Sequence, residues 1–449
     1  MGRRVRENPS AVSNLTIQWP DADAEQVEAA KGRLDVARRR LVARSPEGIV
    51  SVLGTVLDQW RDRNSKWRCR FRAEFPEHSG FSVEVVDAGL DLALEHWTSD
   101  ALSEAIRSEL GRLDGSPEHR ISPFSMTSVL LAGAIPMPSL LASLLPLCVQ
   151  SPVLVKSASR DPLTPHLLAE SLAELDPELG RCIEVVSFPG TDSESLGRFL
   201  AAECVVANGS DETIREISAR IRPSQRFIAY GHKLSLALVR AEGARDDAVN
   251  SIADALALDV CLWDQLGCLS PVCVFVVGEE ARATSVRLTH ALAAALARKE
   301  SSLPRGAVGL ETAATIRNQR EEARVREANG AGVTLCASEG TDWTVVGEAD
   351  AEWRPSPLHR FIRVHPVPRF AELGEALRPV IRNLSSVALA GFEGEDGSLS
   401  EAARELSLLG VSRICPAGRL QAPPIGWHHD GMPVVLPQTR FTGFEFPVA

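Results

Sequence analysis

The chain has 449 residues, of which 44% are hydrophobic and 24% charged, and its formal net charge is −11. These values fit an ordinary globular protein of two or three domains. The acidic balance disfavours nucleic-acid binding, which usually needs a basic surface, although a local basic pocket can still hold an anionic ligand. Nine cysteines without close pairing argue against a disulfide framework, and no apolar signal core follows Met1. We therefore expect a cytoplasmic location.

The region before Ser122 is predicted to be mostly helical. Residues 25–43 are rich in Ala, Arg and Leu, and residues 83–110 show helical apolar periodicity around Trp97. The first fifteen or so residues are expected to be flexible.

Residues 121–155 contain no charged side chain, which raises the question of a membrane span. Five prolines interrupt the stretch and fit poorly with one continuous helix. We predict instead a strand (129–135), a turn (136–138), a helix (139–148) and a strand (152–156). A buried β-α-β unit of this kind is apolar throughout, so no membrane span is expected.

The same alternation continues along the chain and predicts an α/β fold with a doubly wound parallel sheet. The expected strands are 183–188, 204–207, a β pair at 226–230 and 235–239, 273–277, 333–336, 344–346, 361–364, 387–390 and 413–415. The expected helices are 164–175, 211–221, 247–260, 283–298 and 399–409. The charged stretch 317–328 is predicted to be a solvated helix face, and residues 416–437 an irregular return.

Two strand ends carry polar groups where ligands of such sheets bind. The first strand runs into Lys156, with Ser159 and Arg160 close behind it, and these cations and hydroxyls could meet a phosphate. The second runs into Asn208-Gly209-Ser210 before a helix, which offers free backbone amides to a pyrophosphate. A sequence of this second kind also serves commonly as a simple helix cap.

Cys268 lies between a predicted helix and a buried strand, in the sequence Asp264 to Pro271. Gly267 beside it permits tight backbone geometry and leaves room for a substrate. A thiolate attacks carbonyl carbon well, and the resulting thioester stays reactive, so this position fits covalent acyl chemistry. The alternative is that Cys268 is a small buried hydrophobe, which is the usual state of a cysteine.

His428, His429 and Asp430 invite a metal-site interpretation. Adjacent residues of an extended chain point to opposite faces, so both histidines would not easily ligate one ion. We predict no metal site, and expect residues 427–431 to form a loop near the mouth of a cleft.

The order of these parts resembles the aldehyde dehydrogenase superfamily. Within it, the Asp264 to Pro271 motif is similar to the LuxC-type acyl-CoA reductase family, the fatty acid reductase component of bacterial bioluminescence. Further similarities lie at Tyr230-Gly231-His232-Lys233, at 357–361, at 410–414 and at 427–431. The resemblance spans roughly residues 122–433.

The resemblance implies a role for each matched position. Cys268 would be the nucleophile that accepts an acyl group from a thioester. Lys156, Ser159 and Arg160 would lie near the adenosine ribose and its phosphate, and Asn208, Gly209 and Ser210 would border the pyrophosphate. His232 could exchange a proton beside the cleft, since the pKa of an unperturbed histidine is near neutrality; the alternative is a structural histidine that caps a turn.

Three departures from hydrolytic relatives carry mechanistic content. Hydrolytic relatives have a glutamate that activates water, and the matching position here is about Ala229. Because this position holds no base, an acyl-enzyme would be reduced or exchanged rather than hydrolysed. Ser159 and Arg160 replace an acidic residue near the ribose, which favours a 2′-phosphate and therefore NADPH. The asparagine that helps hold the oxyanion falls near 133–135, where no side-chain amide exists, so another group must substitute or the enzyme is slow.

We expect an aldehyde dehydrogenase-like fold with two domains. Residues 1–240 would form the N-terminal helices and the NADP-binding domain, joined by a C-terminal return at about 426–449, and residues 241–425 would form the catalytic domain that carries Cys268. The predicted function is NADPH-dependent reduction of an acyl thioester to the aldehyde. The leading candidate for the thioester is a long-chain acyl-CoA. Alternatives are an acyl carrier protein or another acylated partner protein as donor, a short or aromatic acyl group, or a non-catalytic scaffold. The resemblance also implies a homo-oligomer.

Overall fold

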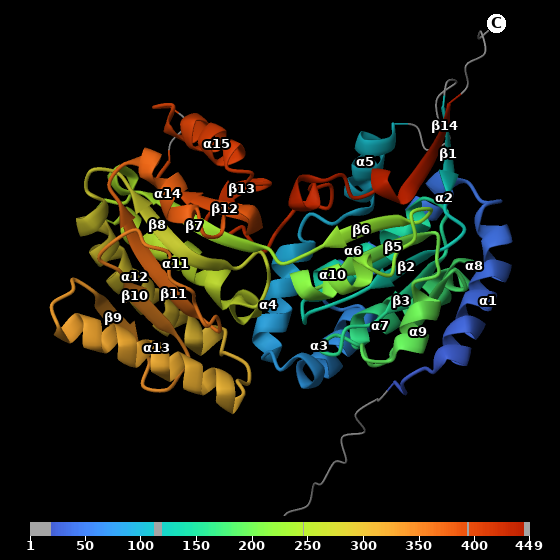
Figure 1. Ribbon diagram of the computed structural model, residues 1–449, viewed down its shortest axis with the longest axis horizontal. Coiled ribbons are helices and arrows are strands. Elements are labelled where there is room, and N and C mark those ends of the chain that lie inside the picture. Colours follow the sequence, from blue (N-terminus) through green and yellow to red (C-terminus); the bar gives the residue numbers. More distant parts are fainter. Residues whose placement is uncertain (1–18, 112–118, 246, 393–394, 444–449) are drawn as a thin grey trace, which may run out of the picture.

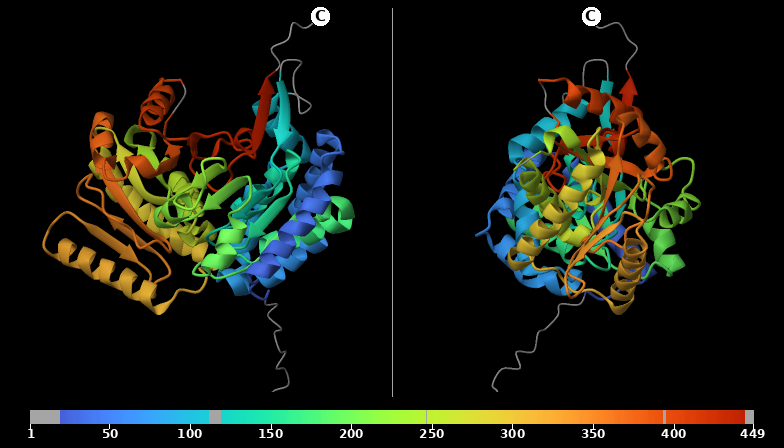
Figure 2. Two further views of the ribbon diagram at one scale, coloured as in Figure 1. Left: turned by 45° about the vertical axis from the view of Figure 1, so that its right-hand side comes forward. Right: turned by 90° about the vertical axis from the view of Figure 1, so that its left-hand side faces the viewer.

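The computed structural model describes residues 19–111, 119–245, 247–392 and 395–443. Two lobes lie side by side, each built on one sheet with helices packed against it (Figures 1 and 2). The first lobe contains α1 (Ala24–Leu41), α2 (Pro46–Arg61), α3 (Lys66–Ser79), α4 (Val83–Leu94), α5 (Ser99–Leu110), β2 (Thr127–Leu130), α6 (Pro136–Cys148), β3 (Val153–Lys156), α7 (Leu163–Leu175), α8 (Pro177–Gly180), β4 (Ile183–Val186), α9 (Ser193–Phe199), β5 (Cys204–Asn208), α10 (Asp211–Ser218) and β6 (Arg226–Tyr230).

The second lobe follows along the chain. It contains β7 (Leu234–Arg240), α11 (Ala248–Cys261), β8 (Pro271–Val277), α12 (Ala281–Ser302), α13 (Leu310–Ala328), β9 (Thr334–Ala337), β10 (Thr344–Gly347), β11 (Phe361–Val367), α14 (Leu373–Leu377), β12 (Leu384–Ala390), α15 (Ser398–Leu408) and β13 (Arg413–Pro416). The last described strand, β14 (Thr439–Gly443), pairs antiparallel with β1 (His119–Pro123) beside the first lobe. The C-terminal segment therefore returns to the side of the first lobe.

The first sheet is parallel and has the order β4-β3-β2-β5-β6. The chain builds outward from β2 through β3 to β4 and then crosses to β5 on the other side of β2. This reversal leaves a crevice at the carboxyl ends of β2 and β5, where ligands of doubly wound sheets bind. The predicted α/β class is confirmed.

The region around α6 differs from the prediction in its boundaries. The strand expected at 129–135 ends at Leu130, and the expected turn at 136–138 is the first turn of α6. The reason is that Pro136 occupies the first position of the helix, where its missing N–H is not needed and its fixed φ suits the helix.

The predicted β pair at 226–230 and 235–239 is wrong. Strand β6 forms the edge of the first sheet, whereas β7 lies inside the second sheet between β12 and β8. All residues of β7 except Arg240 are buried, and a strand apolar on both faces needs neighbours on both sides. Residues 231–233 thus connect the lobes. The domain division at residue 240 stays a prediction. Strand β7, which ends at this residue, belongs to the sheet of the second lobe.

The second sheet has the order β13-β12-β7-β8-β11-β10-β9, and all its pairs are parallel except that of β9 with β10. Helix α13 packs on β9 at the edge, with a mostly exposed charged face as predicted. None of the described helices is long and apolar enough to cross a membrane.

Four of the N-terminal helices are preceded by a Ser or Thr that caps the helix. Ser45, Ser65, Ser82 and Thr98 precede α2, α3, α4 and α5, and each side-chain oxygen accepts the backbone N–H of the third helical residue. The helix expected over 83–110 is therefore two helices, with Trp97 between them. The first residues, for which we expect flexibility, lie outside the described part of the chain.

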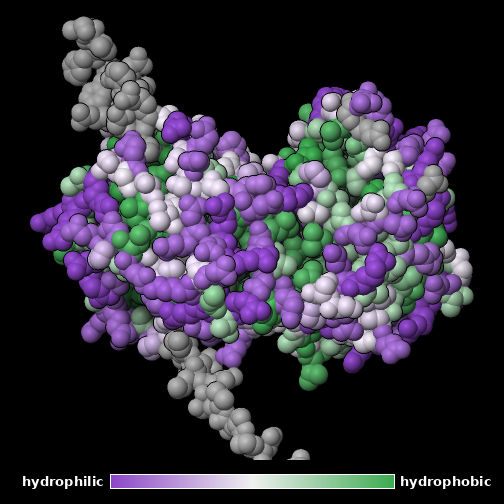
Figure 3. Space-filling view, turned by 180° about the vertical axis from the view of Figure 1, so that it is seen from behind, coloured by the Kyte–Doolittle hydropathy of each residue, from purple (hydrophilic) through white to green (hydrophobic). Residues whose placement is uncertain are grey.

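Figure 3 shows the molecule from behind. The surface is hollowed at one edge between the lobes, and hydrophobic residues gather along that boundary. The candidate site lies at the same boundary.

Candidate active site

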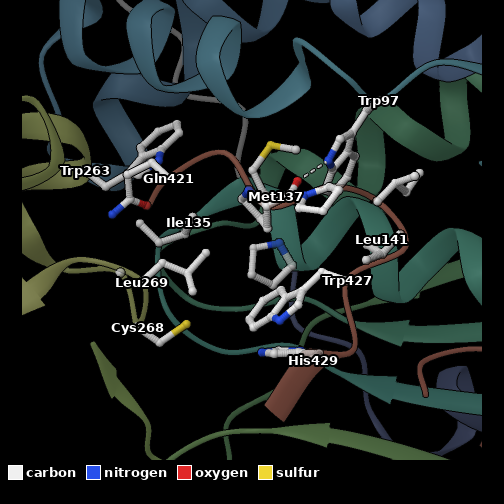
Figure 4. A pocket seen from close by; sticks show the side chains of 15 residues that line it. Trp97, Ile135, Met137, Leu141, Trp263, Cys268, Leu269, Gln421, Trp427 and His429 are labelled. Carbon is white, nitrogen blue, oxygen red and sulfur yellow. Dashed lines mark hydrogen bonds between the residues drawn. The ribbon is translucent and has the colours of Figure 1, made fainter. Parts of the chain in front are cut away.

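Cys268 lies in the loop between the short 3-10 helix η2 (Leu262–Gln265) and β8. Its carbonyl accepts a hydrogen bond of 2.7 Å from the Ser235 hydroxyl of β7, and Ser270 N–H donates to the Gly267 carbonyl at 2.9 Å. The loop is therefore tied both to itself and to the middle of the second sheet. Figure 4 shows the Cys268 sulfur pointing into a pocket.

Two runs of left-handed backbone face each other behind this loop. Residues 263–265 have φ of 49° to 65°, and residues 358–360 have φ of 55° to 66°, although none is glycine. Such a conformation costs roughly 1–2 kcal/mol for each residue with a Cβ. Tertiary contacts must therefore hold both runs in place.

The contact between the two runs is a buried ion pair. Arg360 donates to Asp264 Oδ1 from Nη2 at 2.6 Å and from Nε at 2.9 Å, and it also donates to the Leu303 carbonyl at 2.7 Å. The second Asp264 oxygen accepts the Gly306 N–H at 3.0 Å. Asp264 and Arg360 are 3% and 1% exposed. All these partners together offset the loss of water around two charges.

Gln265 forms a second connection between the same runs. Its Nε2 donates to the carbonyls of Pro271 and Phe361, and its Oε1 accepts the Phe361 N–H, at 2.8–3.0 Å. The start of β11 and the start of β8 are thus joined through one buried amide. We call the Asp264–Arg360 pair and Gln265 together the loop clamp.

Gly267 has a different role from the one predicted. Its φ is not positive, and a Cβ built on it would make ordinary contacts of 3.5–3.7 Å with Ser270, Gln421 and Ile135. The unusual backbone falls instead on Trp263, Asp264 and Gln265. Gly267 does line the pocket, so the expectation of space beside Cys268 agrees with the structure.

The pocket around Cys268 is formed by four parts of the chain and is mostly apolar. It has an empty volume of about 680 Å³, part of it open to solvent. Its lining consists of Trp97, Ile135, Met137, Pro138, Leu141, Trp263, Gly267, Cys268, Leu269, Gln421, Pro423, Pro424, Ile425, Trp427 and His429. Cys268 and Trp97 lie on opposite sides in Figure 4, with Trp97 fixed by a 2.9 Å hydrogen bond from Nε1 to the Pro423 carbonyl. An apolar chain attached to Cys268 could extend toward Trp97.

The Cys268 thiol is protonated at neutral pH in this environment. Burial and, to a smaller extent, the nearby Asp430 carboxylate raise its pKa to about 11. The backbone N–H groups of Cys268 and Leu269 act in the opposite direction, because they stabilise the thiolate. A reaction at this sulfur therefore needs a proton acceptor.

His429 is the titratable side chain that shares the pocket lining with Cys268. Its ring is stacked on Tyr230 at a centroid distance of 4.5 Å and tilted against Trp427 at 4.9 Å. Burial lowers the pKa of His429, so the ring is neutral at pH 7. Asp430 Oδ1 lies 3.8 Å from His429 Nε2.

Two buried polar atoms beside the pocket have no hydrogen-bond partner among the described residues. They are Trp427 Nε1 and Asp430 Oδ1. Buried orphan groups are costly and call for a physical explanation. Residues 427–430 were expected to form a loop at the mouth of a cleft, and the structure places Trp427 and His429 in the pocket wall.

His232 lies apart from the pocket lining. Its side chain is exposed, its backbone N–H donates to Asp211 Oδ1 at 2.8 Å, and its carbonyl accepts from Asn383 at 2.9 Å. Its role in proton exchange stays a prediction, while the backbone contacts are those of a residue in the connection between lobes.

Lys156, Ser159 and Arg160 follow β3 at the carboxyl edge of the first sheet. Lys156 is half-buried, with Nζ 5.0 Å from the centre of the Phe188 ring, and burial lowers its pKa. Ser159 and Arg160 are exposed, and Arg160 donates to the Ser79 carbonyl at 2.7 Å. The sequence analysis missed Asp21, whose carboxylate acts on Lys156 from the N-terminal segment and accepts from the Ser187 hydroxyl at 3.2 Å.

Asn208, Gly209 and Ser210 connect β5 to α10 at the same edge. Asn208 Nδ2 donates to the Leu130 carbonyl at 3.1 Å, and Ser210 Oγ caps α10 by accepting the Thr213 N–H at 3.2 Å. Strand β2 separates β5 from β3, so both groups of predicted cofactor residues border the crevice. In the described ranges, no group of three or more His, Cys, Asp or Glu side chains could hold a metal ion.

Several pocket residues were not assigned to a site from the sequence. Trp97, Met137, Leu141 and Trp263 are apolar side chains, and their type alone indicates only a core. His429 and Trp427 had a signal in the 427–431 motif, but nothing in the sequence shows that this segment returns to Cys268.

The fold is that of the aldehyde dehydrogenases. The structure superimposes with a TM-score of 0.71 on a putative methylmalonate-semialdehyde dehydrogenase from Sinorhizobium meliloti complexed with NAD, at 14% identity, with 96% of this chain and 92% of that one covered. A NAD-dependent benzaldehyde dehydrogenase from Corynebacterium glutamicum gives 0.68 at 17% identity, with 95% and 91% covered.

The chain belongs to the acyl-CoA reductase (LuxC) family, whose model matches residues 41–437. A curated relative, the long-chain acyl-protein thioester reductase of Aliivibrio fischeri, is 23% identical over 413 residues, which cover 89% of this chain and 82% of the relative. The family expected from the motifs is thus confirmed.

The loop clamp generates a first prediction. Replacing Arg360 by Met leaves Asp264 buried without its partner, so we expect the free energy of unfolding to fall by about 3 kcal/mol or more, measured by urea denaturation. Exposed Arg369, which pairs with Glu372 on the surface, is the matched control. Arg369→Met is expected to change stability by less than about 0.5 kcal/mol. Equal stabilities of the two variants would contradict a structural role for the clamp.

Proposed function

We propose that this protein reduces an acyl thioester to the aldehyde with NADPH, through an acyl group held covalently on Cys268. The observation that carries the proposal is the Cys268 sulfur at one side of an apolar pocket. The acyl chain would lie along the apolar lining, which favours a long-chain acyl group over a short polar one. Family membership and the thioester reductases among its relatives support the reaction class.

The reaction follows from these groups. The Cys268 thiolate attacks the thioester carbonyl, the C–S bond to the donor breaks, and the donor leaves as a thiol. One thioester replaces another, so this exchange is close to thermoneutral. The nicotinamide cofactor, held at the crevice of the first sheet, would supply the hydride for the acyl carbon; the C–S bond to Cys268 would then break, releasing the Cys268 thiolate and the aldehyde.

Reduction is expected over hydrolysis because no carboxylate occupies the position from which hydrolytic relatives activate water. The position expected for such a base holds Ala229, and no acidic side chain lines the pocket. A general base of this kind contributes about 10²- to 10⁴-fold to a rate. The acyl-enzyme is therefore expected to persist until hydride or a thiol reaches it.

The decisive test is mass spectrometry of the protein incubated with acyl-CoAs of graded chain length, first without NADPH and then with it. We expect an acyl adduct on Cys268 that disappears when NADPH is added, with one aldehyde formed for each adduct lost. Cys268→Ala is expected to give neither adduct nor aldehyde. Cys69, an exposed free cysteine, provides the matched control, and Cys69→Ala is expected to behave as wild type.

The same experiment separates the alternative donors. No adduct with any acyl-CoA, but one with an acylated carrier or partner protein, would move the proposal to that donor. No adduct with any thioester, together with slow labelling of Cys268 by thiol reagents, would favour the non-catalytic scaffold. The expected association into a homo-oligomer also stays a prediction.

Preference for NADPH rests on the charges beside Lys156. The residues that fit the adenosine end of the cofactor are Lys156 itself, Ser159 and Arg160, and the pyrophosphate would meet Asn208, Gly209 and Ser210. Arg160 is exposed and, on leaving its hydrogen bond to the Ser79 carbonyl, would bind a 2′-phosphate with charge-assisted hydrogen bonds. Asp21 opposes this preference with a negative charge at the same edge.

Two single substitutions test the cofactor preference in opposite directions. Arg160→Gln is expected to lower kcat/KM with NADPH about fivefold and to leave the NADH value nearly unchanged, since one exposed charge pair is worth up to about 1 kcal/mol. Asp21→Asn is expected to raise the NADPH value by a similar factor. Steady-state kinetics with both cofactors is the measurement, and parallel changes for NADPH and NADH would contradict the assignment.

Stabilisation of the oxyanion on the substrate carbonyl would come from the Cys268 backbone N–H together with Trp427 Nε1. The Trp427 indole N–H is buried at the pocket without a partner in the described chain, so it is available as a donor where the expected asparagine is absent. Such a donor lies ready without reorganisation when charge develops.

Trp427→Phe removes the donor and keeps most of the ring. We expect kcat to fall about 100-fold with little change in KM, because the lost interaction forms in the transition state. Trp353, half-buried in the second lobe and absent from the pocket lining, supplies the control Trp353→Phe. A rise in KM with unchanged kcat would show that Trp427 only packs against the substrate.

A further inference from the structure

The His429 side chain lies where a proton must be accepted. We propose that His429 takes the thiol proton of Cys268 during acylation and delivers it to the departing thiol, and that Asp430 positions the His429 ring. The inference rests on the proposed function, since Cys268 must first attack a thioester. It assigns the proton transfer to a residue of the C-terminal return rather than to His232.

The geometry fixes the His429 ring in the pocket wall. Tyr230 of β6 stacks on it with an interplanar angle of 15°, and Trp427 packs against it at 45°. Figure 4 shows the ring on the wall beside the Cys268 sulfur, beneath the Trp427 indole. A ring held between two aromatic side chains keeps its orientation while the substrate binds and leaves.

Asp430 completes the arrangement behind the histidine. Its backbone has a φ of 54°, a strained conformation for a residue with a Cβ. Its Oδ1 is buried, has no hydrogen-bond partner in the described chain, and lies 3.8 Å from His429 Nε2. A carboxylate at this side favours the tautomer with the proton on Nε2 and leaves Nδ1 as an acceptor.

The charges that face His429 and Cys268 agree with this role. Asp430 favours the protonated form of His429, and Lys233 of the connection between lobes disfavours it. Burial keeps the ring neutral at rest, so it can accept a proton. Asp430 also disfavours a thiolate at Cys268, and burial raises the pKa of Tyr230 beyond the range in which that phenol could compete as an acid.

The proton balance closes over one cycle. Cys268 gives its proton to His429 and forms a C–S bond with the acyl carbon; the donor thiolate leaves and takes the proton from His429. Hydride then reduces the acyl carbon, the C–S bond to Cys268 breaks, and the aldehyde departs. The Cys268 thiolate takes one proton from solvent, which is the proton that the overall reduction consumes.

The experiment measures Cys268 acylation by acyl-CoA without NADPH, between pH 6 and 10, by mass spectrometry in rapid quench. Wild type is expected to acylate at a nearly constant rate between about pH 7 and pH 8, where His429 is already neutral and the thiolate fraction of Cys268 is still small, and to converge with His429→Gln near pH 9. His429→Gln is expected to be about 100-fold slower at pH 7. Its rate should rise about tenfold per pH unit, because only the thiolate, whose fraction grows up to a pKa of about 11, then reacts.

The matched control is the neighbouring histidine. His428 is exposed and is not part of the pocket lining, so His428→Gln is expected to keep the wild-type rate and pH profile. Asp430→Asn is expected to slow acylation about tenfold and to keep a flat profile, since the acceptor remains. Added imidazole should restore part of the rate in His429→Ala, which a purely structural role would not allow.

Two results would overturn the inference in distinguishable ways. If wild type acylates and folded His429→Gln acylates with the same rate and pH profile, the proton acceptor is another group, and His232→Gln is then the variant expected to show the loss. If wild type itself is not acylated by any thioester, the proposed function fails and this inference fails with it. Denaturation curves establish that each variant is folded.

Discussion

The buried pair of Asp264 and Arg360 is the constraint on which the reactive loop depends. Six residues with side chains hold left-handed backbone in two facing runs, a conformation that is costly for each of them. The pair, together with Gln265, joins the runs through buried hydrogen bonds. Because removing Arg360 would leave Asp264 buried without its charged partner, the two runs depend on each other. Cys268 owes its fixed place three residues after Gln265 to this clamp.

The reactive thiol and the groups around it come from parts of the chain far apart in sequence. The clamp belongs to the second lobe, the apolar wall of Ile135 to Leu141 belongs to the first, and residues 421–429 cross between them. Asp259 fixes this crossing segment by accepting the N–H groups of Gly418 and Leu420 at 2.7 and 3.0 Å. The site is therefore assembled only when both lobes and the return segment are in place.

The sequence predicted the class of fold and singled out Cys268, whose role as nucleophile stays a prediction, because both rest on local signals. Alternating strands and helices reveal a parallel sheet, and a cysteine motif before a buried strand indicates acyl chemistry. The membership of β6 and β7 in different sheets was missed, since a strand's pattern shows its burial but not its neighbours. His429 and Asp21 were missed for the related reason that each reaches its site from a distant segment. The strain at Trp263 was likewise invisible, because only glycine signals left-handed backbone in a sequence.

The stacking of Tyr230 on His429 makes the pocket accessible to spectroscopy. It is the one tyrosine of the 449-residue chain, and its ring lies 4.5 Å from that of His429. Biosynthetic incorporation of a fluorinated tyrosine would therefore place a single fluorine nucleus beside the pocket and nowhere else. Its resonance, free of overlap, would act as a built-in spectroscopic reporter of each chemical state through which the neighbouring imidazole passes.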